Sequence, residues 1–186
     1  MAYRTLSYDC VRLCHIKKGR NNIMEIEITK DGIIFDGKTV NGEINVGKLK
    51  EILGEPRVHE FKPDPNFLEV LRHKYGDKIS IISYTWDDLG IFCHTRDGEN
   101  VDSIGFVLDH TRKNAPQTPK SDFSGVLKIN GGNWFDTVKT GKDICNKHLK
   151  MAVGQFSVYA EYCPEKKDEP NKTEKDFTLV EVTLET

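Results

Sequence analysis

Residues 79–95 read ISIISYTWDDLGIFCHT, and this stretch decides the fold class. Apolar and polar residues follow a period of two over 79–86 and again over 91–95, which is the pattern of β-strands. The four residues between these segments, DDLG, have the composition of a turn, and a third strand-like segment at 101–108 follows the turn residues Arg96, Asp97 and Gly98. The stretch therefore predicts an antiparallel meander.

The neighbouring carboxylates Asp87 and Asp88 raise the question of an active site. Successive side chains of an extended strand point to opposite faces, so neighbouring aspartates cannot converge on one substrate atom. Aspartate at the start of a tight turn, with Gly90 at its fourth position, is what a type I turn favours. We interpret the pair as a structural turn, with contact to a ligand or partner as the alternative.

The same geometry argues against Cys93 and His94 as a nucleophile and its base, because their side chains diverge on a strand. Together with Ile91, Cys93 is expected to face the core as a small hydrophobic residue. His94 is expected on the opposite face with Phe92 and Arg96.

Flanking segments supply short helices and further strands. Residues 23–35 predict a strand pair, and Asn45 predicts the cap of a helix that ends at Gly54 before Pro56. After a loop at 61–65, Asn66 predicts the cap of a second helix that runs to Tyr75. Its buried stripe is expected to contain Phe67, Val70 and Leu71.

The second half of the chain repeats this order after residues 109–122, which are polar, contain prolines and read as a linker. A strand is expected over 125–132, and strands over 155–163 and 176–184 are joined by a charged loop. Between the first of these strands and the other two, Thr140 predicts the cap of a helix that buries Ile144, Cys145, His148 and Leu149. The fold class is therefore α+β: antiparallel sheet meanders with short helices packed on one face. Residues 23–108 and 123–186 form two tandem α/β units or one continuous domain, and residues 1–22 are expected to pack on the core.

Composition excludes several classes of protein. The 186 residues are 37% hydrophobic, which is enough for a core, and the net charge of −2 gives no field that would attract nucleic acid. No apolar run is long enough to span a membrane. The first twenty residues lack the pattern of a secretory signal, which favours a cytoplasmic protein, although a periplasmic protein whose signal had been removed would look the same. Five scattered cysteines fit reduced thiols rather than a disulfide framework.

No motif in the sequence predicts a cofactor or metal. Cys10, Cys14 and His15 have no second pair of ligands at short spacing, which a zinc site needs. The glycines of residues 130–134 (NGGNW) lack the spacing of a phosphate-binding loop. No hydrolase, metalloprotease or kinase signature is found, so we expect a protein that is not an enzyme.

A specific order of motifs connects the first half to a known group of proteins. A short helix ends in L-G-x-P at 53–56, and Y-x-W-D-x-L-G-I follows at 84–91. This order resembles a domain found among bacterial immunity-type proteins, which neutralise toxins delivered by contact-dependent systems, including the type VI secretion system. The plan is also similar to the β-lactamase-inhibitor-protein-like fold, in which tandem α/β units present a concave sheet to a partner.

The resemblance implies a protein that occludes the active site of a cognate toxin, as a monomer or weak homodimer, with no nucleic acid, membrane or cofactor involved. The expected partner-binding residues lie mainly at turn ends: Trp86, Asp87, Asp88, His94, Arg96, Asp97, Glu99 and Trp134. The charged loop 164–176 is a further candidate surface. For Trp86 and Trp134, burial in the core is the alternative to a role as interface anchors.

Two other functions stay open at this point. One is a small enzyme with a site formed by His94, Asp109 and His110 near strand ends. The other is an assembly module that pairs a sheet edge with a partner.

Overall fold

The computed structural model describes residues 23–41, 43–62, 64–76, 81–113, 115–144 and 147–184. The expected N-terminal segment 1–22, including Cys10, Cys14 and His15, lies outside these ranges. Within them the α+β fold class is confirmed, because two strand-rich sheets are accompanied by three short α-helices.

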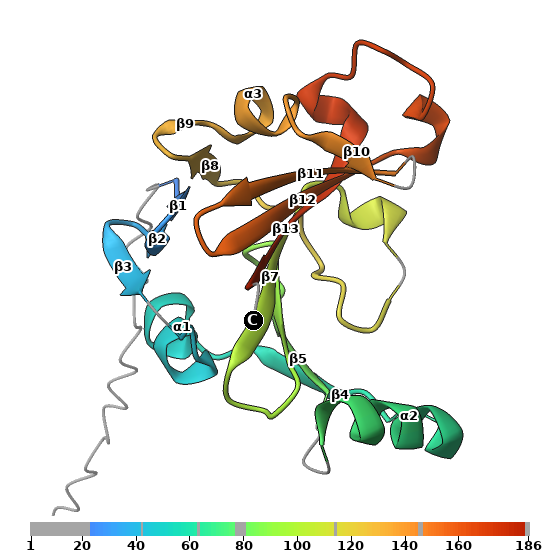
Figure 1. Cartoon of the computed structure of the whole chain (residues 1–186). Helices are drawn as coiled ribbons and strands as arrows, with labels where there is room; N and C mark the ends of the chain where they lie inside the picture. Colours follow the sequence, from blue (N-terminus) through green and yellow to red (C-terminus); the bar gives the residue numbers. More distant parts are fainter. Residues whose placement is uncertain are drawn as a thin grey trace, which may run out of the picture.

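The predicted meander lies within an eight-stranded antiparallel sheet (Figure 1). Trp86 pairs with Ile91 and Tyr84 with Cys93, so the DDLG segment closes a hairpin as predicted. The strand order is β10-β11-β12-β13-β7-β6-β5-β4. The strands are β4 (Arg57–Glu60), β5 (Ile82–Trp86), β6 (Ile91–Thr95), β7 (Val101–Val107), β10 (Lys142–Ile144), β11 (His148–Val153), β12 (Phe156–Tyr162) and β13 (Phe177–Leu184).

A second, five-stranded sheet has the order β3-β2-β1-β8-β9. Asp36 and Gly37 adopt positive φ values of 47° and 78°, as the tight turn between β2 and β3 requires. The central pair, β1 with β8, is parallel, whereas the other pairs are antiparallel. The strands are β1 (Glu25–Thr29), β2 (Gly32–Phe35), β3 (Lys38–Asn41), β8 (Val126–Ile129) and β9 (Gly132–Asn133).

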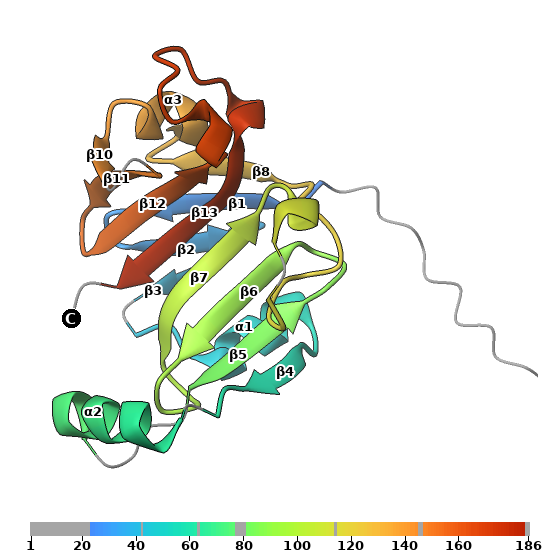
Figure 2. The same cartoon turned by 90° about the vertical axis from the view of Figure 1, so that its right-hand side faces the viewer.

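The five-stranded sheet and α1 (Val46–Leu53) cover one face of the eight-stranded sheet (Figures 1 and 2). Within the described ranges their buried side chains form one hydrophobic cluster, to which the two sheets and α1 contribute Ile28, Leu49, Phe106, Ile129 and Val180. The other face of the eight-stranded sheet is turned toward the viewer in Figure 2, and residues 109–122 cross part of it.

Both sheets contain strands from the two sides of residues 109–122. β1 pairs with β8 in the five-stranded sheet, and β7 pairs with β13 in the eight-stranded sheet. The predicted boundary therefore does not separate two sheets, and the alternative of one continuous domain describes the strand arrangement.

Residues 109–122 form a closed loop rather than a linker. Asp122 accepts hydrogen bonds from the backbone N–H of His110 at 2.6 Å and is 2.7 Å from its Nδ1, so the two ends of the loop are held together. Lys113 forms an ion pair with Glu161 of β12, and Pro119 is buried. These contacts fix the loop on the sheet, as in a packed Ω-loop.

The predicted helix capped by Asn45 is confirmed as α1. Asn45 accepts a hydrogen bond from the Lys48 N–H, and Gly54 ends the helix with a positive φ. In the described ranges no helix is long and apolar enough to cross a membrane.

The second helix differs from its prediction in two respects. α2 (Pro65–Tyr75) is capped by Asp64 rather than by Asn66. Phe67 and Val70, which were expected in a buried stripe, are 51% and 63% exposed. The helix extends away from the sheets (Figure 2), so its apolar face has no core to cover.

The third predicted helix, over residues 140–149, is wrong. A short helix instead lies earlier, at α3 (Trp134–Val138), and the predicted segment forms strands β10 and β11. The apolar residues of this segment fit a helical period, but β11 pairs along its whole length with β12, and this pairing determines its conformation. Three 3-10 turns complete the fold: η1 (His110–Arg112), η2 (Pro164–Lys166) and η3 (Glu174–Asp176).

Candidate functional site

The structure separates the residues that the sequence assigned to one binding surface. Asp87 and Asp88 lie in the β5–β6 turn, at one end of β6. Arg96, Asp97 and Glu99 lie between β6 and β7, at the other end of that strand. Trp134 begins α3, in the second half of the chain. These residues therefore do not form a single site.

Asp87 builds the hairpin rather than presenting a free carboxylate. Its side chain is 19% exposed and accepts two hydrogen bonds from Arg57, at 2.9 Å from Nε and 2.8 Å from Nη2. Hydrogen bonding by the Arg57 guanidinium holds the pKa of Asp87 below its ordinary value. The turn interpretation is thus confirmed, and Asp88 is the exposed member of the pair.

Arg57 also holds the closed loop in place. Its guanidinium donates to the carbonyl oxygens of Pro116 at 2.6 Å and Thr118 at 3.0 Å, while the Thr85 hydroxyl donates to the Gln117 carbonyl at 3.0 Å. One side chain on the edge strand β4 therefore connects the β5–β6 turn to the loop that crosses the sheet.

Neither tryptophan is an accessible anchor, and that part of the prediction is wrong. Trp86 is 4% and Trp134 is 3% exposed. Their indole N–H groups donate to the Gly54 carbonyl at 2.7 Å and to Glu174 Oε1 at 2.8 Å. The alternative reading, core tryptophans with satisfied indole groups, is the correct one.

The β6–β7 turn is internally bonded but remains accessible. Burial alone would raise the pKa of Asp97, but hydrogen bonds from the N–H groups of Glu99 and Asn100 outweigh it and hold the pKa below its ordinary value. Arg96 donates to Asp102 from Nε at 2.7 Å. Asp97 and Glu99 are exposed, so their contact with a partner stays a prediction, as does that of Asp88.

Cys93 and His94 lie on opposite faces of β6, as predicted. Cys93 is fully buried, and burial raises the pKa of its thiol to about 12, which keeps it protonated and unreactive. His94 lies on the outer face, where its ring centroid is 4.9 Å from that of Phe92 and its Nδ1 is 2.8 Å from the Ser83 hydroxyl.

The enzyme site expected from His94, Asp109 and His110 is not assembled. His94 pairs with Ser103 on β7, whereas Asp109 follows the far end of that strand. Asp109 lies six positions after Ser103 in the chain, and most of this segment is strand, so the two residues are on the order of 20 Å apart. His110 instead contacts Asp122.

Burial of His94 predicts a pH-dependent stability. Burial lowers the pKa of His94 below its ordinary value of 6.5, and Glu181 and Asp102 offset this only in part. The folded protein therefore binds this proton more weakly than the unfolded chain, so the contribution to stability is complete above pH 6.5 and is lost as the pH falls through the folded-state pKa. Urea unfolding at several values between about pH 7.5 and pH 5 should show a declining free energy of unfolding.

The His94→Gln variant should lose that part of the pH dependence. The matched control is His73→Gln on α2, where the imidazole is exposed and the wild-type dependence should persist. An unchanged pH profile in the His94→Gln protein would contradict the assignment.

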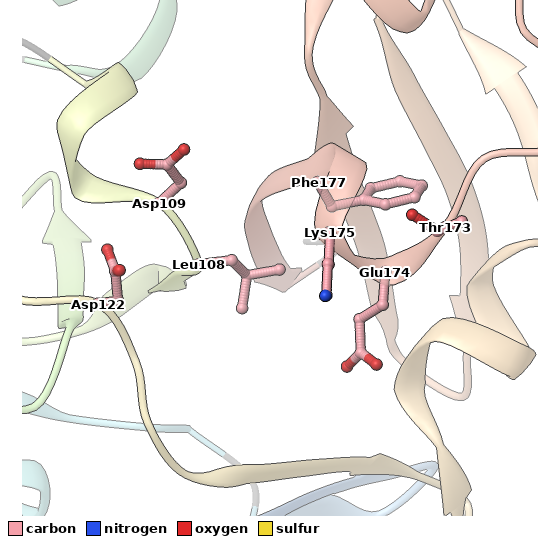
Figure 3. A pocket seen from close by; sticks show the side chains of 7 residues that line it. All are labelled: Leu108, Asp109, Asp122, Thr173, Glu174, Lys175 and Phe177. Atoms are coloured by element: carbon pink, nitrogen blue, oxygen red, sulfur yellow. The ribbon is translucent and has the colours of Figure 1, made fainter.

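One cleft lies between residues that the sequence did not bring together. It has a volume of about 780 Å³ and is lined by Leu108, Asp109, Asp122, Thr173, Glu174, Lys175 and Phe177 (Figure 3). A smaller cavity of about 220 Å³ shares Leu108 and Glu174 with it and extends to Phe123, Gly125, Val126, Leu127, Asn133 and Trp134. We call the two together the β8 cleft.

The walls of the β8 cleft are held by hydrogen bonds. The Phe123 N–H donates to the Val107 carbonyl at 2.6 Å, and the N–H of Leu108 donates to the Thr178 carbonyl at 2.9 Å. Thr173 and Asp176 close η3 through reciprocal capping bonds. The cleft is therefore formed before any ligand enters, although no local sequence signal marks it.

A different region carries most of the large apolar side chains that are exposed in the described part of the chain. Six large apolar side chains are exposed in the described ranges, and four of them lie between residues 58 and 70: Val58, Phe61, Phe67 and Val70. The first two belong to the edge strand β4 and the residue after it, and the other two to α2. The sequence predicted Phe67 and Val70 as core residues, so this surface was missed.

Metal binding has no support in the described part of the chain, where no group of three or more His, Cys, Asp or Glu side chains could hold an ion. Comparison with curated proteins and with solved structures gave no match. A family model described as a domain of unknown function, DUF7738, matches residues 25–143. The matched residues begin in β1 and end within β10. They include the β5–β6 hairpin, the closed loop and part of the β8 cleft. The chain therefore belongs to the DUF7738 family.

Proposed function

We propose that the protein binds another protein through the surface formed by β4 and α2, and that this partner is a bacterial toxin which it neutralises. The observation that supports binding is the concentration of exposed apolar side chains at residues 58–70. Large exposed apolar groups gathered on one region of a soluble protein mark interaction sites.

The lack of buried side chains in α2 supports the presence of a partner at this surface. The helix has 11 residues, and none of its described side chains is buried. Helices of this length are marginal in water unless tertiary packing supports them. Here the caps supply the local stabilisation: Asp64 accepts from the N–H of Asn66 and of Phe67, and the Gly76 N–H donates to the Arg72 carbonyl. A partner groove that received Phe67 and Val70 would supply the missing packing.

The choice of a toxin as partner rests on the motif order L-G-x-P and Y-x-W-D-x-L-G-I described above. An immunity protein needs a stable scaffold and an accessible apolar surface that can cover an enzyme's active site. A cytoplasmic location belongs to the same proposal. Pairing of a partner strand along the edge of β4 is an alternative that uses the same region.

The test uses the purified product of a toxin gene encoded beside this one. Wild-type protein should bind it with a Kd below about 1 μM and should restore growth when the two are co-expressed. The Phe67→Ser, Val70→Ser double variant should bind on the order of 100-fold more weakly. Its thermal midpoint should stay unchanged, because both side chains are already more than half exposed.

The matched control replaces Glu69 and Arg72 by serine, at the same spacing on another face of α2. It should bind within about threefold of wild type. Failure of the wild-type protein to bind the toxin would overturn the immunity assignment, and equal binding by the Phe67/Val70 variant would overturn the proposed surface.

A further inference from the structure

We propose that the outer face of the eight-stranded sheet binds an arginine side chain of a partner protein, at a site formed by Phe92, His94, Ser103, Tyr159 and Glu181. We call this the outer-face site. Its residues belong to β6, β7, β12 and β13, which lie side by side on the face that Figure 2 turns toward the viewer. Strand β5 separates the site from β4 and α2, and the inference does not depend on the proposed function.

One row of residues across the strands places a carboxylate between two aromatic residues. Tyr159 pairs with Glu181, Glu181 with Gly105, and Gly105 with Phe92. A Cβ atom at Gly105 would lie 2.2 Å from Cζ of Phe92. The Phe92 ring therefore lies over the glycine, in the place of a side chain, and next to Glu181. A guanidinium group can pair with such a carboxylate and stack on a neighbouring ring.

The neighbouring row supplies a hydroxyl group that has no partner. Ser103 pairs with His94 on one side and with Thr183 on the other. It is 6% exposed, yet its hydroxyl forms no hydrogen bond within the described ranges. Buried polar groups are seldom left in this state. Ser103 and Glu181 are diagonal neighbours, about 7–8 Å apart, so N–H groups on two sides of one guanidinium can reach both.

Glu181 is a partly buried carboxylate that lacks a cation. It forms no ion pair with any described residue. By contrast, Glu161 of β12 pairs with both Lys113 and Lys147. The acceptor that remains on this part of the sheet is therefore anionic, and a cationic ligand complements it.

Asp102 adds negative charge beside the site. Arg96 donates to its Oδ1, whereas its Oδ2 is buried and has no hydrogen-bond partner among the described residues. Burial lowers the pKa of His94, and Glu181 and Asp102 act against that effect. Both carboxylates are thus close enough to favour a positive charge here. Arginine carries that charge at every physiological pH.

The test follows the amide NMR signals of the isotope-labelled full chain at about pH 7.5 and constant ionic strength. The probes are arginine, lysine and citrulline, each acetylated at its amino group and methylamidated at its carboxyl group. Capped arginine should bind with a Kd of about 1–10 mM and should shift the signals of Ser103 and Glu181. Capped lysine, which lacks the planar fork, should bind at least about threefold more weakly. Capped citrulline has a similar shape but no charge, and it should not bind up to about 50 mM.

Free arginine distinguishes a partner's side chain from a small molecule. It should bind no more tightly than capped arginine, because the site as described pairs only with the guanidinium. Binding about tenfold tighter than that of the capped form would overturn the assignment to a partner protein.

Two variants test the acceptors of the site. Glu181→Gln should weaken capped arginine at least about fivefold. Ser103→Ala should weaken it about twofold to threefold, while the free energy of unfolding stays unchanged or rises, because the hydroxyl has no hydrogen bond to lose. Glu51→Gln, an exposed change on α1, is the matched control and should leave the affinity unchanged.

Any of three results would overturn the proposal. These are the absence of capped-arginine binding up to about 50 mM, equal affinity for capped lysine or citrulline, and an affinity that Glu181→Gln leaves unaltered. The Phe67/Val70 variant described above should bind capped arginine like the wild type, since both changes lie on α2 outside this site. Failure of either proposal therefore leaves the other one standing.

Discussion

Replacing Gly90 by alanine is expected to destabilise the protein more than any other single change considered for it. Gly90 has a φ of 68°, which costs an L-residue about 1–2 kcal/mol. In addition, a Cβ atom at this position would lie 2.1 Å from the backbone N of Phe123 and 2.5 Å from the carbonyl carbon of Asp122. The Gly90 carbonyl also accepts from the Val107 N–H at 2.8 Å, so the turn cannot move away without breaking the sheet. The loss should reach roughly 3–5 kcal/mol, measured by urea unfolding.

Gly37→Ala separates the two contributions to that loss. Gly37 has a φ of 78°, but nothing lies within 4 Å of a Cβ placed there. This variant should lose only the conformational part, about 1–2 kcal/mol. Equal losses at Gly37 and Gly90 would show that the close approach of the closed loop to the β5–β6 turn does not contribute.

Arg57→Ala is expected to release the closed loop 109–122 from the sheet. The variant loses two hydrogen bonds to Asp87 and those to the carbonyls of Pro116 and Thr118. It also leaves a carboxylate that is only 19% exposed with Lys120, at 3.9 Å, as its remaining cation. We expect a loss of about 2–3 kcal/mol in the free energy of unfolding. Tryptic cleavage after Lys120, which is exposed, should accelerate at least about tenfold because the loop opens locally.

Three further variants test the geometry of this contact. Arg57→Lys keeps the charge but not the planar fork, so it should recover less than half of the loss. Asp87→Ala should be destabilising and should couple to Arg57→Ala in a double-mutant cycle, whereas Asp88→Ala should be neutral. If the loop stayed protected from trypsin in Arg57→Ala, the Thr85–Gln117 contact and the ion pair of Lys113 with Glu161 would be sufficient to hold it.

The hairpin at 79–95 and helix α1 were predictable because their signals are local. Turn residues between two period-two segments require a hairpin, and Asn45 and Gly54 mark both ends of α1 by their own capping chemistry. The placement of Cys93 and His94 on opposite faces of β6 was predictable for the same reason, because side chains alternate along a strand.

Errors arose where distant contacts decide the conformation. Phe67 and Val70 have the spacing of a buried stripe, but spacing does not show whether a core lies opposite the helix. Residues 148–153 are compatible with a helix until β12 provides a pairing partner. Strand β4 has only four residues and was not predicted, although Arg57 within it organises the contact between the turn and the closed loop.

The β8 cleft could not have been found from the sequence. Its walls come from the end of β7, the segment before β8, the start of α3 and the turn η3. The pairings of β1 with β8 and of β7 with β13 bring these segments together, and neither pairing leaves a motif in the sequence.

The parallel pairing of β1 with β8 also delays completion of the five-stranded sheet during synthesis. Lys128 and Glu25, which form an ion pair across it, are 103 residues apart in the chain. The hairpins of β1, β2 and β3 leave the ribosome before β8 does, so one edge of β1 stays open until β8 has emerged. At about 5–20 residues per second this wait lasts about 5–20 s. Long-range closure of this kind slows folding, so the nascent chain carries an open strand edge until β8 has been synthesised.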